Sequence, residues 1–262
     1  MDHAAIDAQM QKLASAFIPR NCRKFTYRIF DDQPKKSAWG FYIDPKPFEG
    51  KVVARTDDAI IVKNQGKQSE FSVLDRSLVT PEPGEGARVE VHPYARRRFD
   101  GERADTPREE TRIGLDGKPY TLQTQVLGEA PAKLPIPEPR CFELRQLIEQ
   151  LESLPAPDGF RNVTHLLVDA GATDFAWVDP KPADIIKTPP SISFSVSSAK
   201  FEGRVTVLYE RGLDLYAVEL SRDGERVERV DEVCFDDLGQ VLERLIDDGE
   251  WRRIRVKILT RH

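Results

Sequence analysis

The chain has 262 residues, 39% of them hydrophobic and 32% charged, and its formal net charge is −5. This length accommodates one large domain or two ordinary ones, and the apolar content can build hydrophobic cores. No apolar run approaches the ~20 residues of a membrane-spanning helix, and the first residues lack the pattern of a secretory signal. The three cysteines, Cys22, Cys141 and Cys234, are far apart, as is typical of reduced thiols. We therefore expect a soluble, cytoplasmic protein without a membrane partner.

The charge is distributed unevenly along the chain. Residues 1–135 hold 22 Lys and Arg against 20 Asp and Glu, a net charge of +2, and residues 136–262 hold 17 against 24, a net charge of −7. An acidic C-terminal half repels nucleic acid, whereas the N-terminal half permits such a partner.

The N-terminal half predicts a helix followed by short strands. Apolar residues recur at helical spacing from Ile6 to Phe17, Asp2 can cap this helix, and Pro19 ends it. Alternating segments between Gly, Asp and Pro predict strands at 24–30, 51–55, 59–63, 70–74 and 88–92. Spacings of about ten residues favour a small meander or a partly open barrel. A hairpin is predicted over 111–127, because Asp116-Gly117 supplies the positive φ angles of a tight turn.

Residues 128–140 contain four prolines and predict an extended connector, because proline fixes φ and lacks an N–H donor. The connector would separate an N-terminal domain, 1–127, from a C-terminal domain, 141–262. Helices are predicted at 141–154, 162–170 and 237–248, and strands at 174–178, 191–197, 204–210, 213–220, 226–233 and 252–259. The pattern indicates an α+β fold in two lobes: an N-terminal helix with a small barrel-like sheet, and a C-terminal antiparallel sheet with helices on one face.

The final predicted strand carries a basic face. Arg253, Arg255 and Lys257 alternate with apolar residues, so they point to one side of the sheet. Three like charges in line favour an acidic partner across the C-terminal sheet, such as Glu228 or Glu232, and would otherwise mark a binding edge.

Two short sequence motifs each occur once in both halves of the chain. Residues 44–47 and 179–182 both read Asp-Pro-Lys-Pro, and residues 48–52 and 201–205 both read Phe-Glu-Gly-basic-Val. The second element opens a series of short strands in each half. Its two copies are 153 residues apart and those of the first element 135, so coincidence and duplication both stay open.

Candidate metal ligands and nucleophiles are few. His3, His92, His165 and His262 share no metal-ligand spacing, and no Cys-x-x-Cys occurs, so the sequence predicts neither a metal site nor a cofactor. His165 falls off the apolar stripe of its helix and is expected to be solvated. Residues 197–200 match Ser-x-x-Lys, but they lie between two strands, where residues three apart point to opposite faces. We interpret them as a polar turn, and no catalytic residue is predicted.

The clearest binding pattern consists of Tyr94, Arg96, Arg97, Arg98 and Phe99. Three guanidiniums can neutralise phosphates while an aromatic ring stacks on a base. The alternative is a solvated arginine cluster at the end of a strand, with its aromatic side chains in the core. If the first helix lies nearby, four more basic residues extend the pattern: Arg20, Arg23, Lys24 and Arg28.

Residues 48–63, which begin Phe-Glu-Gly-Lys-Val, together with 72–78 and 86–91, resemble the KfrB-like domain of plasmids and integrative conjugative elements. In that family a Gly-basic-apolar strand, a Thr-Asp turn and a second apolar strand build a small SH3-like barrel. The resemblance is confined to the N-terminal part of the chain. It implies an accessory protein of a mobile genetic element that works by binding, and it implies no catalytic residues.

The sequence favours a non-enzymatic protein that contacts nucleic acid or a partner protein through residues 94–99. One alternative is an enzyme with a site between the lobes, around Asp179, Lys181 and Lys187, which requires a deep cleft and shifted pKa values there. Another is a structural subunit of a larger assembly, in which partners cover the sheet edges. Neither the identity of the partner nor the oligomeric state follows from the sequence.

Overall fold

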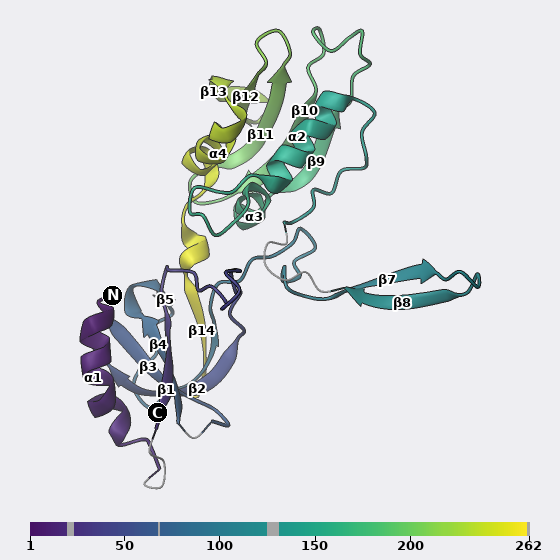
Figure 1. Ribbon diagram of the computed structural model, residues 1–262. Coiled ribbons are helices and arrows are strands. Elements are labelled where there is room, and N and C mark those ends of the chain that lie inside the picture. The colour runs from purple at the N-terminus through teal and green to yellow at the C-terminus, as the bar shows by residue number, and fades with distance from the viewer. Residues whose placement is uncertain (20–23, 68, 125–130, 261–262) are drawn as a thin grey trace. The chain divides into compact units, whose positions relative to one another are not determined.

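The polypeptide folds into two units, and the first is built from both ends of the chain (Figure 1). In this computed structural model, residues 1–19, 24–67, 69–124 and 131–260 are described. The first unit combines Met1–Ala95 with Glu250–His262, and the second comprises Arg96–Gly249. Helices combined with mainly antiparallel sheets confirm the expected α+β class. No helix in the described ranges is long and apolar enough to cross a membrane.

The division into units differs from the predicted domains, 1–127 and 141–262. The final strand β14 (Ile254–Thr260) pairs with β6 (Arg88–His92) of the first unit and not with the C-terminal sheet. Residues 128–140 are not a boundary either, because the described part, from residue 131 on, belongs to the second unit. Leu134 is buried there, and its N–H donates a hydrogen bond of 2.9 Å to Glu152. The prolines therefore set an extended path within the second unit and not a free linker.

A seven-stranded sheet forms the body of the first unit. Its strands are β1 (Thr26–Phe30), β2 (Phe48–Arg55), β3 (Ala59–Asn64), β4 (Glu70–Asp75), β5 (Val79–Thr80), β6 and β14, with 3-10 turns η1 (Arg76–Leu78) and η3 (Glu250–Arg252) before β5 and β14. The order is β1-β4-β3-β2-β6-β14-β5, with parallel pairs at β1–β4 and β14–β5. The order does not return from β5 to β1, so the described residues form no closed barrel, and the expected small SH3-like barrel is not observed.

This sheet buries apolar side chains on both faces. Helix α1 (His3–Ser15) lies on one face (Figure 1). Its Met10 belongs to the same buried cluster as Ile61 and Phe71 of the sheet. Asp2 caps the helix as predicted, because its carboxylate accepts hydrogen bonds from N–H groups of the first turn. The opposite face buries a second cluster that includes Val52, Ile60, Leu74, Val89, Ile254 and Val256.

The basic residues of β14 do not pair with the acidic residues that the sequence predicted as their partners. Glu228 and Glu232 belong to the second unit, whereas β14 lies in the sheet of the first. Lys257 Nζ lies 3.7 Å from a carboxylate oxygen of Glu90 on β6. The expected acidic pairing within the C-terminal sheet was wrong, because the apolar side of β14 completes a different core.

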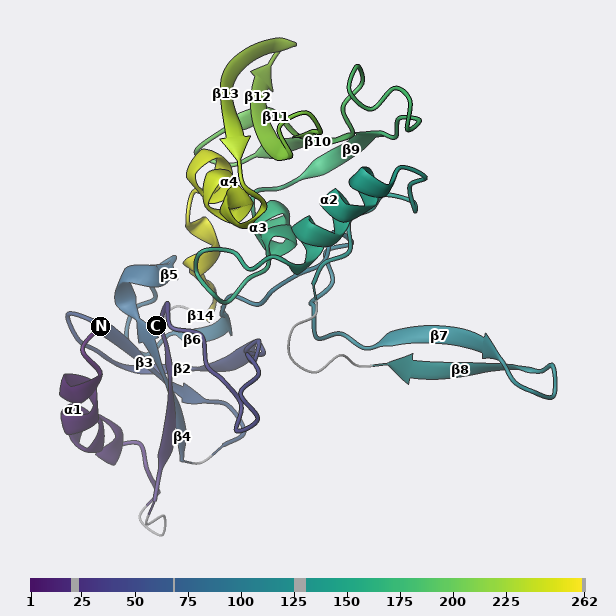
Figure 2. The ribbon, with the colours of Figure 1, turned by 45° about the horizontal axis from the view of Figure 1, so that its top comes forward.

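The second unit places three helices on one face of a five-stranded antiparallel sheet (Figure 2). The strands are β9 (Thr173–Val178), β10 (Ser191–Ser197), β11 (Glu202–Glu210), β12 (Leu215–Arg222) and β13 (Glu225–Val233), in the order β13-β12-β11-β10-β9. The helices are α2 (Phe142–Ser153), α3 (Val163–Asp169) and α4 (Leu238–Ile246), the last preceded by the 3-10 turn η2 (Phe235–Asp237). Apart from the final strand, these elements confirm the predicted C-terminal arrangement.

His165 is buried, contrary to the solvated position expected for it. Its relative exposure is 0%, and its Nδ1 accepts a hydrogen bond of 3.2 Å from the N–H of Asn162. Asn162 is the N-cap of α3, and the two residues form a capping box. The imidazole turns back to the helix start, so its position on the helical stripe does not decide its burial.

A buried ion cluster connects the ends of the helices in the second unit. The guanidinium of Arg161, with a side-chain exposure of 0%, contacts Asp158 at 2.9 Å, Asp169 at 2.8 Å, and Asp247. Burial of a charge is tolerated when opposite charges and hydrogen bonds compensate its desolvation. The cluster joins the segment before α3 to the ends of α3 and α4.

A separate hairpin consists of β7 (Arg108–Ile113) and β8 (Pro119–Thr124) (Figures 1 and 2). The predicted turn at Asp116-Gly117 is confirmed, because Gly117 has a φ of 75° and its N–H donates to Gly114 O at 2.9 Å. Every residue of both strands is exposed. The predicted end of the hairpin at 125–127 lies outside the described residues.

The recurring Phe-Glu-Gly element has the same structural use in both copies. A Cβ on Gly50 would lie 2.5 Å from the carbonyl oxygen of Lys63, and one on Gly203 would lie 2.5 Å from that of Ser221. Each carbonyl belongs to the neighbouring strand of the sheet. Only glycine permits so close an approach of two strands.

We expect Gly50→Ala and Gly203→Ala each to lower the free energy of unfolding by about 1–3 kcal/mol, because the added methyl group overlaps a backbone carbonyl. Chemical denaturation followed by circular dichroism measures the loss. Gly84→Ala and Gly212→Ala are matched controls, because no atom lies within 4 Å of a Cβ at either position. Each control should change the free energy by less than about 0.5 kcal/mol. Equal losses in all four variants would contradict the close-approach requirement.

Candidate nucleic-acid interface

The residues predicted to bind do not form one exposed patch. Tyr94 belongs to the first unit, whereas Arg96, Arg97, Arg98 and Phe99 belong to the second. Arg96 and Arg98 are buried, with relative exposures of 1% and 9%, and Arg97 is exposed. The burial of two of the three guanidiniums contradicts the exposed cluster that the sequence predicted.

The two buried arginines make internal contacts. The guanidinium of Arg96 lies 4.8 Å from the centroid of the Phe160 ring, a cation–π geometry. Arg98 Nε lies 3.2 Å from a carboxylate oxygen of Asp100, and Arg98 Nη1 donates to the carbonyl oxygen of Thr106 at 3.3 Å. These contacts hold residues 96–106 in place within the second unit and keep the guanidinium groups of Arg96 and Arg98 away from solvent.

The two aromatic residues also make ring contacts within their own units. Tyr94 meets Trp251 with ring centroids 4.8 Å apart, and Phe99 meets Phe175 at 5.1 Å. Both pairs have the edge-to-face geometry that aromatic rings prefer. This arrangement agrees with the alternative in which the aromatic side chains belong to the core.

The expected extension of the patch is only partly described. Arg20 and Arg23 lie outside the described residues, as does Cys22. Arg28 Nε is 3.9 Å from a carboxylate oxygen of Glu70, so its charge faces an acidic neighbour.

A different set of basic residues lies side by side on the sheet of the first unit. Lys51 of β2 is in cross-strand register with Lys63 of β3 on one side and with Arg88 of β6 on the other. Side chains in register point to the same face, and this face is the one that α1 covers over Ile61. Lys51 and Arg88 are exposed there. We call Lys63, Lys51 and Arg88 the basic row.

Cross-strand neighbours of like charge destabilise a sheet unless other groups compensate. Lys63 Nζ donates to the carbonyl oxygen of Phe17 at 2.6 Å. Arg88 Nη2 donates to Gln65 Oε1 at 2.9 Å, and the same nitrogen is 3.8 Å from the Glu49 carboxylate. Lys51, in the middle of the row, has no side-chain partner within the described part of the chain. The row therefore presents an ammonium that an external anion can pair with.

Beyond the basic row, the same open face continues across β6 and β14. Lys257 is in register with Glu90, and Arg255 is in register with His92. Glu90 also lies 3.0 Å from His92 Nε2. Among the described residues of β2, β3, β6 and β14, this face carries two carboxylates, Glu49 and Glu90, and five permanent cations: Lys51, Lys63, Arg88, Arg255 and Lys257.

The two units differ strongly in charge. Met1–Ala95 and Glu250–His262 together hold 19 Lys and Arg against 14 Asp and Glu, a net charge of +5, and Arg96–Gly249 holds 20 against 30, a net charge of −10. The contrast exceeds that between the sequence halves, because the basic final strand joins the first unit. An anionic ligand is therefore favoured by the first unit and repelled by the second.

Asp179, which the enzyme hypothesis placed in a site, caps a helix start. Its carboxylate accepts hydrogen bonds from the N–H groups of Arg140, at 3.0 Å, and Cys141, at 2.8 Å, just before α2. The hydrogen bond from Arg140, followed by that from Cys141 and by the Arg140 guanidinium, holds the pKa of Asp179 below its usual value. Lys181 and Lys187 are exposed. The contacts of Asp179 are thus those of a structural residue.

The Ser-x-x-Lys segment forms the expected polar turn. Lys200 Nζ donates to the carbonyl oxygens of Glu243 and Asp247 at 3.1 Å each, at the C-terminal end of α4. A cation at this end of a helix satisfies its last carbonyls. Ser197 ends β10, and the hydroxyl of its neighbour Ser198 is within hydrogen-bonding distance, 3.2 Å, of Phe201 O. Lys200 is therefore hydrogen-bonded to the C-terminal end of α4 and is not placed as a general base for Ser197.

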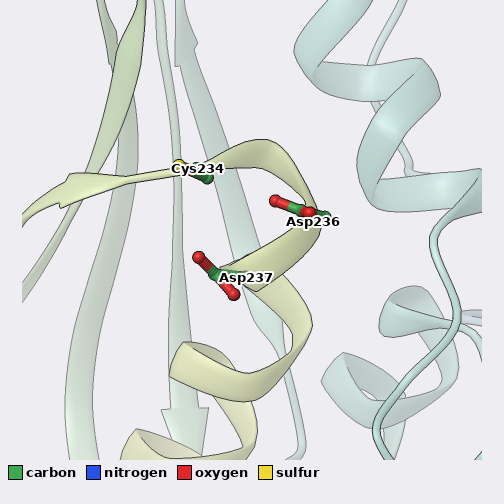
Figure 3. Close-up of side chains that lie close together, drawn as sticks. All are labelled: Cys234, Asp236 and Asp237. Carbon is green, nitrogen blue, oxygen red and sulfur yellow. The ribbon is translucent and has the colours of Figure 1, made fainter.

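In the part of the chain that the structure describes, one group of side chains has donor atoms close enough to share a metal ion. The ligand atoms of Cys234, Asp236 and Asp237 lie within 4.8 Å of one another at η2 (Figure 3). All three residues are exposed and nearly consecutive in sequence. Exposed groups of this kind are common without a metal, so the group alone does not identify a metal centre.

No family model matches the sequence, and neither the curated proteins nor the solved structures give a match. The resemblance to the KfrB-like domain therefore stays a prediction.

The basic row was missed by sequence reasoning, although its residues lay in predicted strands. Lys51, Lys63 and Arg88 are separated by 12 and 25 positions, and only the strand register brings them together. The available signal was the single basic residue on the polar side of each strand. The consecutive arginines at 96–98 are a more conspicuous pattern in the sequence, but two of the three are buried in the structure and present no charge at the surface.

We expect Asp179→Asn to lower the free energy of unfolding at pH 7 by about 0.5–2 kcal/mol, because it removes a charged acceptor at a helix start. A lowered folded-state pKa means that ionised Asp179 stabilises the fold above its unfolded pKa of about 3.9, and that this contribution is lost as pH falls through the folded pKa. The difference between variant and wild type should therefore shrink on acidification, as urea denaturation at several pH values measures. Asp184→Asn, an exposed residue of the same loop, is the control and should change the free energy of unfolding at pH 7 by less than about 0.5 kcal/mol.

Proposed function

We propose that the protein binds nucleic acid through the open sheet face of its first unit and has no catalytic role of its own. The observation that carries the proposal is the basic row, in which Lys51 stands in register between Lys63 and Arg88. Phosphate groups are the anions that neutralise such a row and release counterions on binding. The positive charge of the first unit attracts the same ligand over a longer range.

The chemistry of the face supports contacts to the nucleic-acid backbone and not to base edges. Adjacent strands lie about 4.8 Å apart, so three cations in register span roughly 10 Å of a flat surface. Contacts to phosphates position a protein but carry no sequence information. Binding should therefore be sensitive to salt and largely independent of sequence.

The resemblance to KfrB-like proteins supports an accessory role of this binding in a mobile genetic element. An accessory protein of this kind acts where the element's DNA is handled, so we place it in the cytoplasm. A protein partner, the other class that the sequence left open, is compatible with the same role on a different surface.

Replacing the two exposed members of the row tests the proposal. We expect Lys51→Ala combined with Arg88→Ala to weaken binding of a labelled DNA duplex about tenfold or more in fluorescence anisotropy at low salt. The slope of the logarithm of the binding constant against the logarithm of salt concentration should fall by about 2, one for each lost phosphate contact.

The matched control is Lys181→Ala combined with Lys187→Ala, which removes two exposed cations from the second unit. It lowers the net charge equally and should leave the affinity and the salt slope unchanged. Arg97→Ala tests the exposed member of the sequence-predicted pattern in the same assay. An affinity that falls equally in the control, or not at all in the Lys51 and Arg88 variant, rejects the sheet face as the interface.

A further inference from the structure

The β7–β8 hairpin is a two-stranded sheet that pairs with no other strand among the described residues (Figures 1 and 2). Every residue of both strands is exposed. Large apolar side chains are among them, with exposures of 46% for Tyr120 and 37% for Leu122, and 112% for Leu115 at the turn. A lone hairpin is at best marginally stable in water, so these features indicate a surface that another strand completes.

The two edges of the hairpin differ in charge. Strand β7 carries Arg108, Glu109, Glu110 and Arg112, whereas β8 carries no charged residue from Pro119 to Thr124. Charged side chains on an edge strand oppose pairing with another chain, and their absence leaves the unpaired backbone groups open to it. The open edge is therefore that of β8.

The charge of the hairpin argues against nucleic acid and membranes as its partners. Residues 108–124 hold three basic and three acidic side chains, so a nucleic acid gains little by contacting them. Tyr120 is in register with Arg112, and Leu122 with Glu110, so the apolar side chains share their face with charges. A surface inserted into lipid requires a face without such charges. A protein strand is the remaining class of partner.

The hydrogen-bond pattern of the hairpin determines which residues of β8 have backbone groups that point away from β7. Next to the turn, Gly114 N–H donates to Lys118 O at 2.9 Å, and hydrogen-bonded pairs alternate along an antiparallel ladder. By this alternation, Thr121 and Gln123 direct their N–H and C=O groups away from β7. Pro119 also lies on the outward side but has no N–H to donate.

We propose that two copies of the chain associate through β8 about a two-fold axis at Leu122, which extends each hairpin to a shared four-stranded sheet. Antiparallel pairing then sets Thr121 opposite Gln123 of the second copy, so their outward N–H and C=O groups meet. Leu122 faces its own counterpart, and Tyr120 faces Thr124. No charge opposes a like charge across the new pair, because β8 has none.

An axis at Leu122 pairs the outward backbone groups of Thr121 with those of Gln123, the two residues of β8 whose N–H and C=O both point away from β7. Shifting the axis to Thr121 would set Pro119 opposite Gln123 of the second copy, and the carbonyl of Gln123 would lose its donor. A shift by an odd number of residues would set outward groups against inward ones. Two short edges bury less than the roughly 1,200 Å² of stable interfaces, so the dimer should be weak and dependent on concentration.

Position-specific disulfides test the register. In a chain with Cys22→Ser and Cys234→Ser, and with the buried Cys141 retained, we expect Leu122→Cys to form a disulfide-linked dimer under mild oxidation. The two Cβ atoms would lie about 4.5–5.5 Å apart in this pair, which is near enough for a disulfide after small shifts. Glu110→Cys, on the same face of β7, is the matched control and should stay monomeric, because the β8 strands of both copies would lie between the two introduced cysteines.

Sedimentation of the otherwise unchanged chain tests association itself. Wild type should shift from monomer to dimer with concentration, and Leu122→Glu should raise the dissociation constant more than about tenfold, because two carboxylates would face each other. Leu115→Glu, at the turn and outside the paired edge, should leave the dissociation constant unchanged. A wild type that is monomeric throughout, a dimer that survives Leu122→Glu, or equal cross-linking through Glu110→Cys overturns the proposal.

The dimer does not depend on the proposed nucleic-acid binding. These measurements contain no nucleic acid, and the variant with Lys51→Ala and Arg88→Ala should dimerise like wild type. Failure of one proposal therefore leaves the other standing.

Discussion

The pairing of the last strand with the N-terminal sheet is the constraint on which the rest of the structure depends. Ile254 and Val256 of β14 are buried in the same cluster as Val52 and Val89, so the first core is incomplete without the end of the chain. The second unit is consequently an insertion between β6 and β14. Its own core has no share in that cluster, and Arg161 with its three carboxylates fixes the helix ends around it.

The same strand determines where charge gathers. The apolar side of β14 faces the core, so its other side necessarily presents Arg255 and Lys257 beside β6. These cations extend the face that holds the basic row. The first unit thereby becomes the positive part of an acidic chain, and the second unit holds the excess of carboxylates. The asymmetry arises because the topology places these basic residues, which lie far from β6 in the sequence, in the sheet of the first unit.

Local features could be predicted from the sequence, and long-range register could not. The helix capped by Asp2, the turn at Gly117 and the strand 191–197 all depend on neighbouring residues, and each was predicted close to its observed bounds. The alternation in β14 fits either sheet equally well, so its partner was assigned wrongly. Burial of Arg96 depends on Phe160, a residue 64 positions away, which no local pattern reveals.

Residues 93–95 and 250–253 are the parts of the first unit that adjoin the second in sequence, and they continue two strands that are neighbours in the sheet. His92 at the end of β6 stands in register with Arg255 near the start of β14. The chain therefore leaves and re-enters the first unit at adjacent points, where an ordinary hairpin would need a turn of a few residues. The second unit thus occupies the place in the sequence where a turn between β6 and β14 would stand, and the sheet of the first unit is continuous without it. Joining Ala95 directly to Glu250 through a short turn would leave all of its strand pairs intact.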